Sequence, residues 1–161
     1  MRFGTSATIS ILAGLQFACV GCPRPEDELS REFLNRSTLE RRETFGSYGP
    51  TVQVDLYLLA MSSSHPSDLE LANSLAVTGQ AIVPALLKRL ETADRERVKF
   101  YIIDVFWGMH EIGSYAVGSD ANLIRILERE TSTLNDPGLR ALAASMVSKM
   151  RAQTSRFPPE R

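Results

Sequence analysis

The stretch Val98-Lys-Phe-Tyr-Ile-Ile-Asp-Val-Phe-Trp-Gly-Met109 decides the fold class of this 161-residue chain. Its apolar side chains recur at intervals of three and four residues, at Val98, Tyr101, Ile102, Val105, Phe106 and Met109. Side chains at that spacing share one face of an α-helix, and such a face has to be buried against a partner. The chain shows no comparable alternation of period two, which would indicate strands. The sequence therefore predicts an all-α fold.

Helix start and stop signals divide the chain further. Ser67 and Glu70 match a capping box, in which both side chains bind free backbone N–H groups at a helix start. Asp136 followed by Pro137 marks another start, and Gly79 marks a helix end. The patterns predict about seven helices, over residues 26–44, 51–61, 67–78, 81–91, 95–110, 120–131 and 137–152.

An internal repeat relates two pairs of these helices. When the chain is shifted by 41 residues, apolar positions of one copy fall on apolar positions of the other. The first copy contributes Ile82, Val83, Ala85, Leu86, Val98, Tyr101, Ile102, Val105, Phe106 and Met109, and the second contributes Leu123, Ile124, Ile126, Leu127, Leu139, Leu142, Ala143, Met146, Val147 and Met150. A helix pair that repeats every ~40–47 residues is typical of a solenoid, in which each pair buries its apolar faces against the next.

The first copy resembles the bacterial HEAT repeat. Residues 79–90, Gly-Gln-Ala-Ile-Val-Pro-Ala-Leu-Leu-Lys-Arg-Leu, are followed by Asp94 in the predicted turn. That family opens its first helix with Gly and Pro and begins its second with Val-Arg, for which Val98-Lys99 stands here. Aromatic residues replace the usual Ala in the second helix, and the second copy lacks the Gly and Pro. The resemblance implies a short α-solenoid of antiparallel helix pairs; a plain antiparallel helical bundle is the alternative.

The N-terminus carries the three-part pattern of an export signal. Arg2 precedes a mostly apolar stretch whose contiguous core covers residues 9–15, and a strongly polar segment follows Cys22. Glycine and polar residues interrupt the apolar stretch, whereas a bilayer-spanning helix needs about 20 predominantly apolar residues. The pattern therefore predicts a signal peptide over residues 1–21, and a buried N-terminal helix is the alternative.

The end of this segment, Cys19-Val20-Gly21-Cys22, resembles the bacterial lipobox, in which an apolar residue and two small residues precede a Cys. Cys19 stands where the family usually has Leu, and processing at Cys19 itself fits the pattern less well. The resemblance implies cleavage between Gly21 and Cys22 and a diacylglyceryl group on the Cys22 thiol. It implies a lipid anchor on the extracytoplasmic side of the cell envelope, on the outer membrane if the source is Gram-negative. Ordinary cleavage after Gly21 would instead give a soluble secreted protein.

These patterns divide the chain into a signal peptide (1–21), a tether (22–29), a HEAT-like helical domain (30–152) and a frayed tail (153–161). The net charge of −1 at pH 7 provides no basic face for a nucleic acid backbone. Both cysteines lie within the first 22 residues, so the helical domain has neither a disulfide framework nor a cysteine zinc site.

The sequence indicates no catalytic site, metal site or cofactor. His110-Glu111 is not followed by a second His at helical spacing, which a zinc protease would need. Asp104 and Ser114 would complete a triad with His110 on paper, but triads are recognised by their geometry. A small accessory enzyme or hydrolase that uses His110 is therefore an alternative function. Another is a small-ligand carrier, which needs a roomy apolar pocket.

One set of side chains on the 95–110 helix is a candidate partner-binding surface. Lys99, Ile103, Trp107 and His110 form a stripe beside the apolar face. In HEAT-type stacks the second helix of each pair lines the concave binding surface, and Trp is enriched at interface hot spots. The alternative is that this helix packs on both sides and that Trp107 belongs to the core. The predicted function is a membrane-tethered, extracytoplasmic scaffold or adaptor that binds another protein without catalysis.

Overall fold

The computed structural model describes residues 25–63 and 69–152, and over these residues the chain is helical, without strands, as predicted. The α-helices are α1 (Pro25–Asn35), α2 (Thr38–Phe45), α3 (Pro50–Ser63), α4 (Leu69–Thr78), α5 (Val83–Glu91), α6 (Glu96–Ile112), α7 (Ala121–Ser132) and α8 (Pro137–Ala152). Two short 3-10 helices, η1 (Gly79–Ile82) and η2 (Val117–Ser119), precede α5 and α7. The predicted signal peptide, Cys22, the Ser67 cap and the tail over 153–161 lie outside the described residues.

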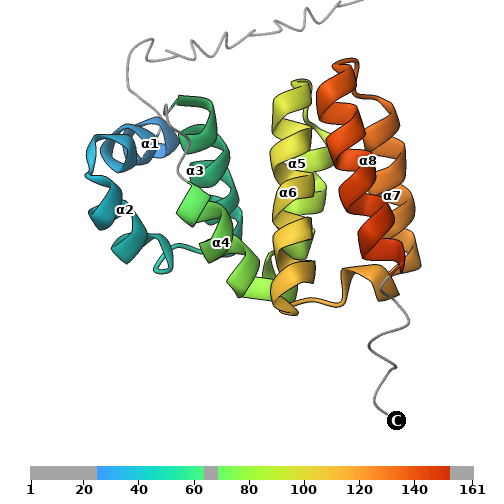
Figure 1. Ribbon diagram of the computed structural model, residues 1–161. Coiled ribbons are helices and arrows are strands. Elements are labelled where there is room, and N and C mark those ends of the chain that lie inside the picture. Colours follow the sequence, from blue (N-terminus) through green and yellow to red (C-terminus); the bar gives the residue numbers. More distant parts are fainter. Residues whose placement is uncertain (1–24, 64–68, 153–161) are drawn as a thin grey trace, which may run out of the picture.

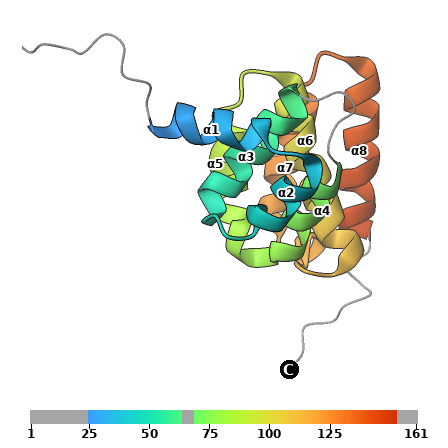
Figure 2. The same cartoon turned by 90° about the vertical axis from the view of Figure 1, so that its left-hand side faces the viewer.

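The helices follow one another in pairs, from α1–α2 at one end of the molecule to α7–α8 at the other (Figure 1). Most of these helices contact the helix two places along the chain. Thus α1 contacts α3 and α3 contacts α5, while α2 contacts α4, α4 contacts α6 and α6 contacts α8. Figure 2 views the molecule from the end at which α1 and α2 lie. We call α2, α4, α6 and α8 the even helices.

The predicted apolar face of α6 lies in the core. Ile102, Val105, Phe106 and Met109 are buried almost completely. The related face of α8 is buried at Ala143, Val147 and Met150, whereas Leu142 is 50% exposed. A second tie to the core comes from α3, where the Tyr57 hydroxyl donates a hydrogen bond to the Tyr101 carbonyl oxygen at 3.3 Å. The two copies of the sequence repeat therefore bury similar but not identical faces.

The single helix predicted over residues 26–44 is two helices, α1 and α2. The chain breaks at Ser37, whose hydroxyl accepts a hydrogen bond from the Glu40 backbone N–H at 3.3 Å. The Glu40 carboxylate in turn accepts a bond from the Ser37 backbone N–H at 2.8 Å. This capping box satisfies the first donors of α2, so a new helix starts where an uninterrupted one was expected.

Two glycines fix the ends of α4 and α6. Gly79 has φ +63° and ends α4, as predicted, while Gly113 has φ +70° and ends α6. A Cβ at Gly79 would lie 2.7 Å from the Ser114 carbonyl oxygen, so only glycine fits this close approach. The Ser114 hydroxyl donates to the Ala76 carbonyl oxygen and joins the same two helix ends. No helix in the two described ranges has the length and apolar content needed to cross a membrane.

Candidate functional site

The large apolar side chains that are exposed in the described part of the chain all lie on the even helices. Leu39 on α2 is 65% exposed, Val77 on α4 is 70% exposed, Ile112 on α6 is 53% exposed and Leu142 on α8 is 50% exposed. Single exposed apolar residues are ordinary on protein surfaces, but here they all fall on one set of helices. The even helices are therefore the candidate interaction surface.

A groove between α4 and α6 lies on this surface. Its volume is about 240 Å³, and it is lined by Ala72, Asn73, Asp104, Trp107, Gly108, Glu111 and Ile112. Small residues let the two helices approach here, since a Cβ at Gly108 would lie 3.2 Å from the Ala76 Cβ. The groove is thus bounded by a close helix crossing and by the longer side chains of α6. We call it the α4–α6 groove.

Asp104 places a partly buried carboxyl group in the α4–α6 groove. Burial raises the pKa of Asp104, and no hydrogen bond or charge from the described residues offsets that effect. The carboxylate also contributes to the raised pKa of the Tyr57 hydroxyl, although burial of the phenol is the larger cause. A carboxylate in this state is stabilised by any cation that reaches it.

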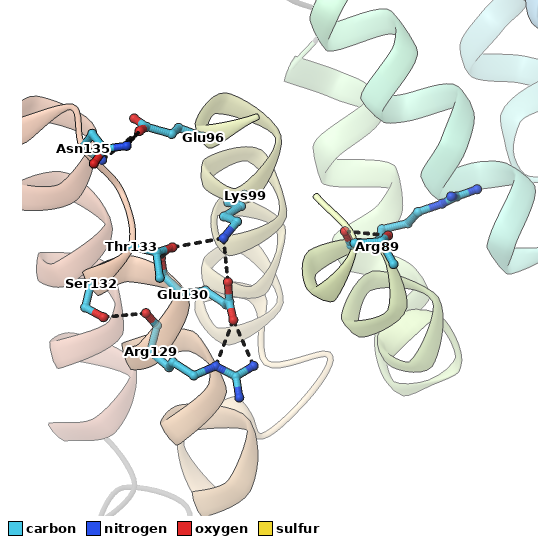
Figure 3. A network of polar contacts seen from close by, with 9 residues as sticks. Arg89, Glu96, Lys99, Arg129, Glu130, Ser132, Thr133 and Asn135 are labelled. Carbon is cyan, nitrogen blue, oxygen red and sulfur yellow. Dashed lines mark hydrogen bonds and ion pairs between the residues drawn. The ribbon is translucent and has the colours of Figure 1, made fainter. Parts of the chain in front are cut away.

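The stripe predicted from the sequence includes residues that bind α7 rather than solvent. The Lys99 ammonium group contacts Glu130 Oε2 at 2.8 Å and Thr133 Oγ1 at 3.0 Å (Figure 3). Ile103 is completely buried and belongs to the core. Both residues therefore help to hold α6 against the pair that follows it. The partner-binding role of the stripe as a set stays a prediction.

Trp107 is the member of the stripe that reaches both neighbouring even helices. Its ring lies 5.7 Å from the His110 ring and 5.7 Å from the Lys149 ammonium nitrogen of α8. It also lines the α4–α6 groove beside Asp104. The indole is partly buried and packs against the core, and its role as a partner-binding anchor stays a prediction.

The polar network between α6 and α7 is centred on Glu130. Burial disfavours the charged form of this carboxylate, but its contacts with Lys99 and Arg129 outweigh that effect and lower its pKa. At the start of α6, Glu96 accepts hydrogen bonds from the backbone N–H groups of Asp136 and Asn135, which lower the pKa of Glu96. Figure 3 shows both groups of contacts between α6 and the segments that follow it. These contacts hold α6 against α7 and the segment that follows it, so the role of the network is structural.

Asp104, His110 and Ser114, the three residues of the possible catalytic triad, have other contacts. The Ser114 hydroxyl donates to the Ala76 carbonyl oxygen, the His110 ring lies against Trp107, and Asp104 lines the α4–α6 groove. Within the described ranges, no cluster of three or more His, Cys, Asp or Glu side chains is placed to hold a metal ion. The chemistry offered by the groove is therefore recognition through a carboxylate, an indole and apolar walls.

The α4–α6 groove is not among the features predicted from the sequence, where Asp104 stands only as a possible partner of His110. A signal was present: Asp104, Gly108 and Glu111 are spaced i, i+4, i+7, which places them on one helix face. That face contains a small residue between two acids, which is typical of a close helix crossing with a polar rim. The partner helix α4 could not be identified from this spacing alone.

Comparisons of the chain with protein-family models, with curated proteins and with solved structures find no significant match. The function is therefore inferred from the residues and their geometry. The candidate site is the exposed surface of the even helices, which includes the α4–α6 groove.

Proposed function

We propose that this protein is a membrane-tethered, extracytoplasmic scaffold or adaptor that binds another protein through its even helices. The observation that carries the proposal is the placement of Leu39, Val77, Ile112 and Leu142, which are all exposed on these helices. Burial of apolar surface contributes roughly 25 cal/mol per Å², so a partner that covers such side chains gains free energy. The even helices offer this gain along one layer.

We also propose that the helical domain is a short HEAT-like solenoid. Two observations support it. The contacts link α1 to α3 and α3 to α5, and α2 to α4, α4 to α6 and α6 to α8, which is the neighbour pattern of stacked helix pairs. The 41-residue shift of the sequence repeat also places α5 on α7 and α6 on α8. In such a stack the second helices form a continuous surface suited to an extended partner.

The proposed location depends on lipid attached to Cys22. Each buried methylene contributes about 0.8 kcal/mol, so the two or three acyl chains of a lipoprotein anchor it stably where one chain would not. Signal cleavage before Cys22 leaves the helical domain close to the membrane surface, because α1 begins at Pro25. The support for this proposal is the lipobox-like sequence.

Two cysteine variants test the location. Cells that produce the unmodified chain, Cys22→Ala or Cys19→Ala are fractionated after growth with a labelled fatty acid. We expect label and membrane association for the unmodified chain and for Cys19→Ala, and neither for Cys22→Ala. Recovery of the unmodified protein as a soluble, unlabelled species would contradict the lipoprotein proposal and favour a secreted form.

Site-specific photo-crosslinking in intact cells tests the adaptor function. A photoreactive amino acid is placed at Val77 or Ile112 on the even helices, and, as matched controls, at the exposed positions Thr51 on α3 and Asn122 on α7. We expect a discrete adduct of the same added mass from both even-helix positions and none from the controls. No adduct from either test position, or equal adducts from all four, would contradict the proposal.

A further inference from the structure

We propose that the α4–α6 groove binds an arginine side chain presented by the partner protein. The inference rests on the proposed adaptor function and names the chemistry that the adaptor recognises. It is carried by three features of the groove, which are its charge, its size and its aromatic wall.

The charge of the groove is negative. Asp104 and Glu111 lie two helical turns apart on α6 and both line it, while α4 contributes the neutral side chains of Ala72 and Asn73. None of the described residues that line the groove is a lysine or an arginine. A partly buried carboxylate without a cation is poorly solvated, so a guanidinium that enters replaces lost hydration with charge-assisted hydrogen bonds.

The size and walls of the groove suit one long side chain. Its volume of about 240 Å³ is too small for a packed helix. Ile112 and Ala72 provide apolar surface for the methylene stem of an arginine, whose charged end then lies beside Asp104. Ile112 also belongs to the exposed apolar set of the even helices, so the groove is continuous with the proposed interface.

Trp107 provides the aromatic wall. Its ring already attracts a cation of this chain, because the Lys149 ammonium nitrogen lies 5.7 Å from the ring centroid. A guanidinium is planar, stacks on aromatic rings and binds carboxylates with two parallel hydrogen bonds. A groove that combines an indole with a carboxylate therefore favours arginine over the compact, strongly hydrated ammonium group of lysine.

The chain carries its own reporter for this binding, since Trp107 is its only tryptophan. The full-length protein in detergent is titrated with N-acetyl-arginine amide while indole fluorescence is recorded. The matched control probe is N-acetyl-citrulline amide, which has the same shape without the charge. We expect a saturable change with the arginine probe and none with the citrulline probe. Equal responses to both, or no saturable response to arginine, would overturn the proposal.

Three single-residue variants test whether the arginine probe binds in the α4–α6 groove. We expect Asp104→Asn to weaken arginine binding about tenfold or more, because a hydrogen bond to a charged group contributes about 1.5–3 kcal/mol. Glu111→Gln should weaken it less, since Glu111 is exposed, and Asp94→Asn in the α5–α6 turn should leave it unchanged. Far-ultraviolet circular dichroism and thermal melting confirm that each variant is folded. Unchanged binding by folded Asp104→Asn would overturn the proposal.

The crosslinking experiment separates this inference from the proposed function. If Ile112 gives a partner adduct but the arginine probe does not bind, the adaptor function stands and the arginine site is wrong. If the probe binds but no even-helix position gives an adduct, the adaptor function is contradicted. We expect both to succeed and Asp104→Asn to lower the adduct yield from Ile112.

Discussion

The helix pairs α5–α6 and α7–α8 share an apolar pattern 41 residues apart, but their outward faces differ. The face of α6 that contacts the next pair carries Lys99, Ile103, Trp107 and His110, and the same positions of α8 carry Arg140, Ala144, Ser148 and Arg151. On α8 these four positions line an open groove of about 390 Å³. The two large apolar residues of the covered α6 face, Ile103 and Trp107, are thus replaced by the small residues Ala144 and Ser148 on α8, where no described helix covers them. In the proposed solenoid, α7–α8 is the last described pair, and a terminal repeat needs such a polar outer face to stay soluble.

The starts of the two pairs differ as well. Gly79 opens the first pair in a left-handed conformation, and the equivalent residue of the second pair is Asp120. Asp120 caps α7, because its carboxylate accepts hydrogen bonds from the backbone N–H groups of Asn122 and Leu123. The sequence repeat therefore preserves the buried faces more strongly than the way in which each helix begins. Mutations at equivalent positions can test this comparison.

The largest effect is expected at the covered face of α6. Ile103→Ala should lower the free energy of unfolding by about 3 kcal/mol, because it truncates a completely buried side chain and leaves a cavity in its place. Ala144→Ser, at the equivalent exposed position of α8, should change it by less than about 0.5 kcal/mol. Urea denaturation of both variants measures the difference. Similar small effects at both positions would show that the α6 face is not covered in solution.

The next effect concerns the first residue of the α5–α6 pair. Gly79→Ala should destabilise the protein by about 2 kcal/mol, because alanine is disfavoured at φ +63° and its Cβ would meet the Ser114 carbonyl oxygen. Gly113→Ala has a similar φ of +70° with no atom within 4 Å of the added Cβ, so it should cost only about 1 kcal/mol. Thermal melting of the two variants compares them. Equal losses would assign the whole effect to the backbone conformation.

The ion pairs at the two faces provide a third comparison. Glu130→Gln should cost about 2 kcal/mol at neutral pH, because Lys99 and Arg129 lose their carboxylate partner at a site with a side-chain exposure of only 10% for Glu130. Glu128→Gln removes the exposed pair with Arg151 on the outer face and should cost less than about 0.5 kcal/mol. Chemical denaturation at low and high salt measures both. A larger loss for Glu128→Gln would reverse our assignment of the covered face.

The Glu130 effect should also depend on pH. Its carboxyl pKa is lowered in the folded protein, so its stabilising contribution is complete above the unfolded pKa of about 4.3. The contribution is lost as the pH falls from there through the folded pKa. The stability difference between the parent and Glu130→Gln should therefore be constant near neutrality and shrink in acid.

Helix periodicity was sufficient to predict most of the fold. The three- and four-residue spacing on α6 predicted its buried face, because burial of one helix face is a local property of the sequence. The break between α1 and α2 was missed although Ser37 and Glu40 form the same capping pattern as Ser67 and Glu70. The charged helical pattern continues from α1 into α2, so it did not indicate that Ser37 caps a new helix. A few capping hydrogen bonds decide whether one long helix or two shorter helices form here.

The candidate site was harder to predict because it depends on pairs of helices. The i, i+4 spacing placed Lys99 and Ile103 on a stripe but did not show that α7 and α8 cover it. Likewise, the side chains of α6 could not show that Ala72 and Asn73 of α4 complete a groove with Asp104. The sequence of one helix specifies its faces, whereas the neighbour of each face follows from the tertiary fold.

The smallest effect on stability is expected at Asp104, whose equivalent on α8 is the uncharged Ser145. Burial raises the Asp104 pKa, so its charge at neutral pH opposes folding, and Asp104→Asn should slightly raise the melting temperature. This gain should be complete above the folded pKa and vanish as the pH falls below the unfolded value of about 3.9. Melting curves of both proteins between neutral and acid pH measure it. A lower melting temperature for Asp104→Asn at neutral pH would assign the carboxylate a structural role.

A gain of stability combined with a loss of arginine binding would have a specific meaning. Residues selected for packing lose stability when they are replaced, whereas binding residues are often retained at some cost to the fold. Asp104 is the position of the α4–α6 groove where the two effects should have opposite signs, because the same partial burial disfavours the free carboxylate and strengthens its contact with a cation. If both effects are found in one variant, the difference between Asp104 on α6 and Ser145 on α8 reflects binding rather than the position of each helix in the stack.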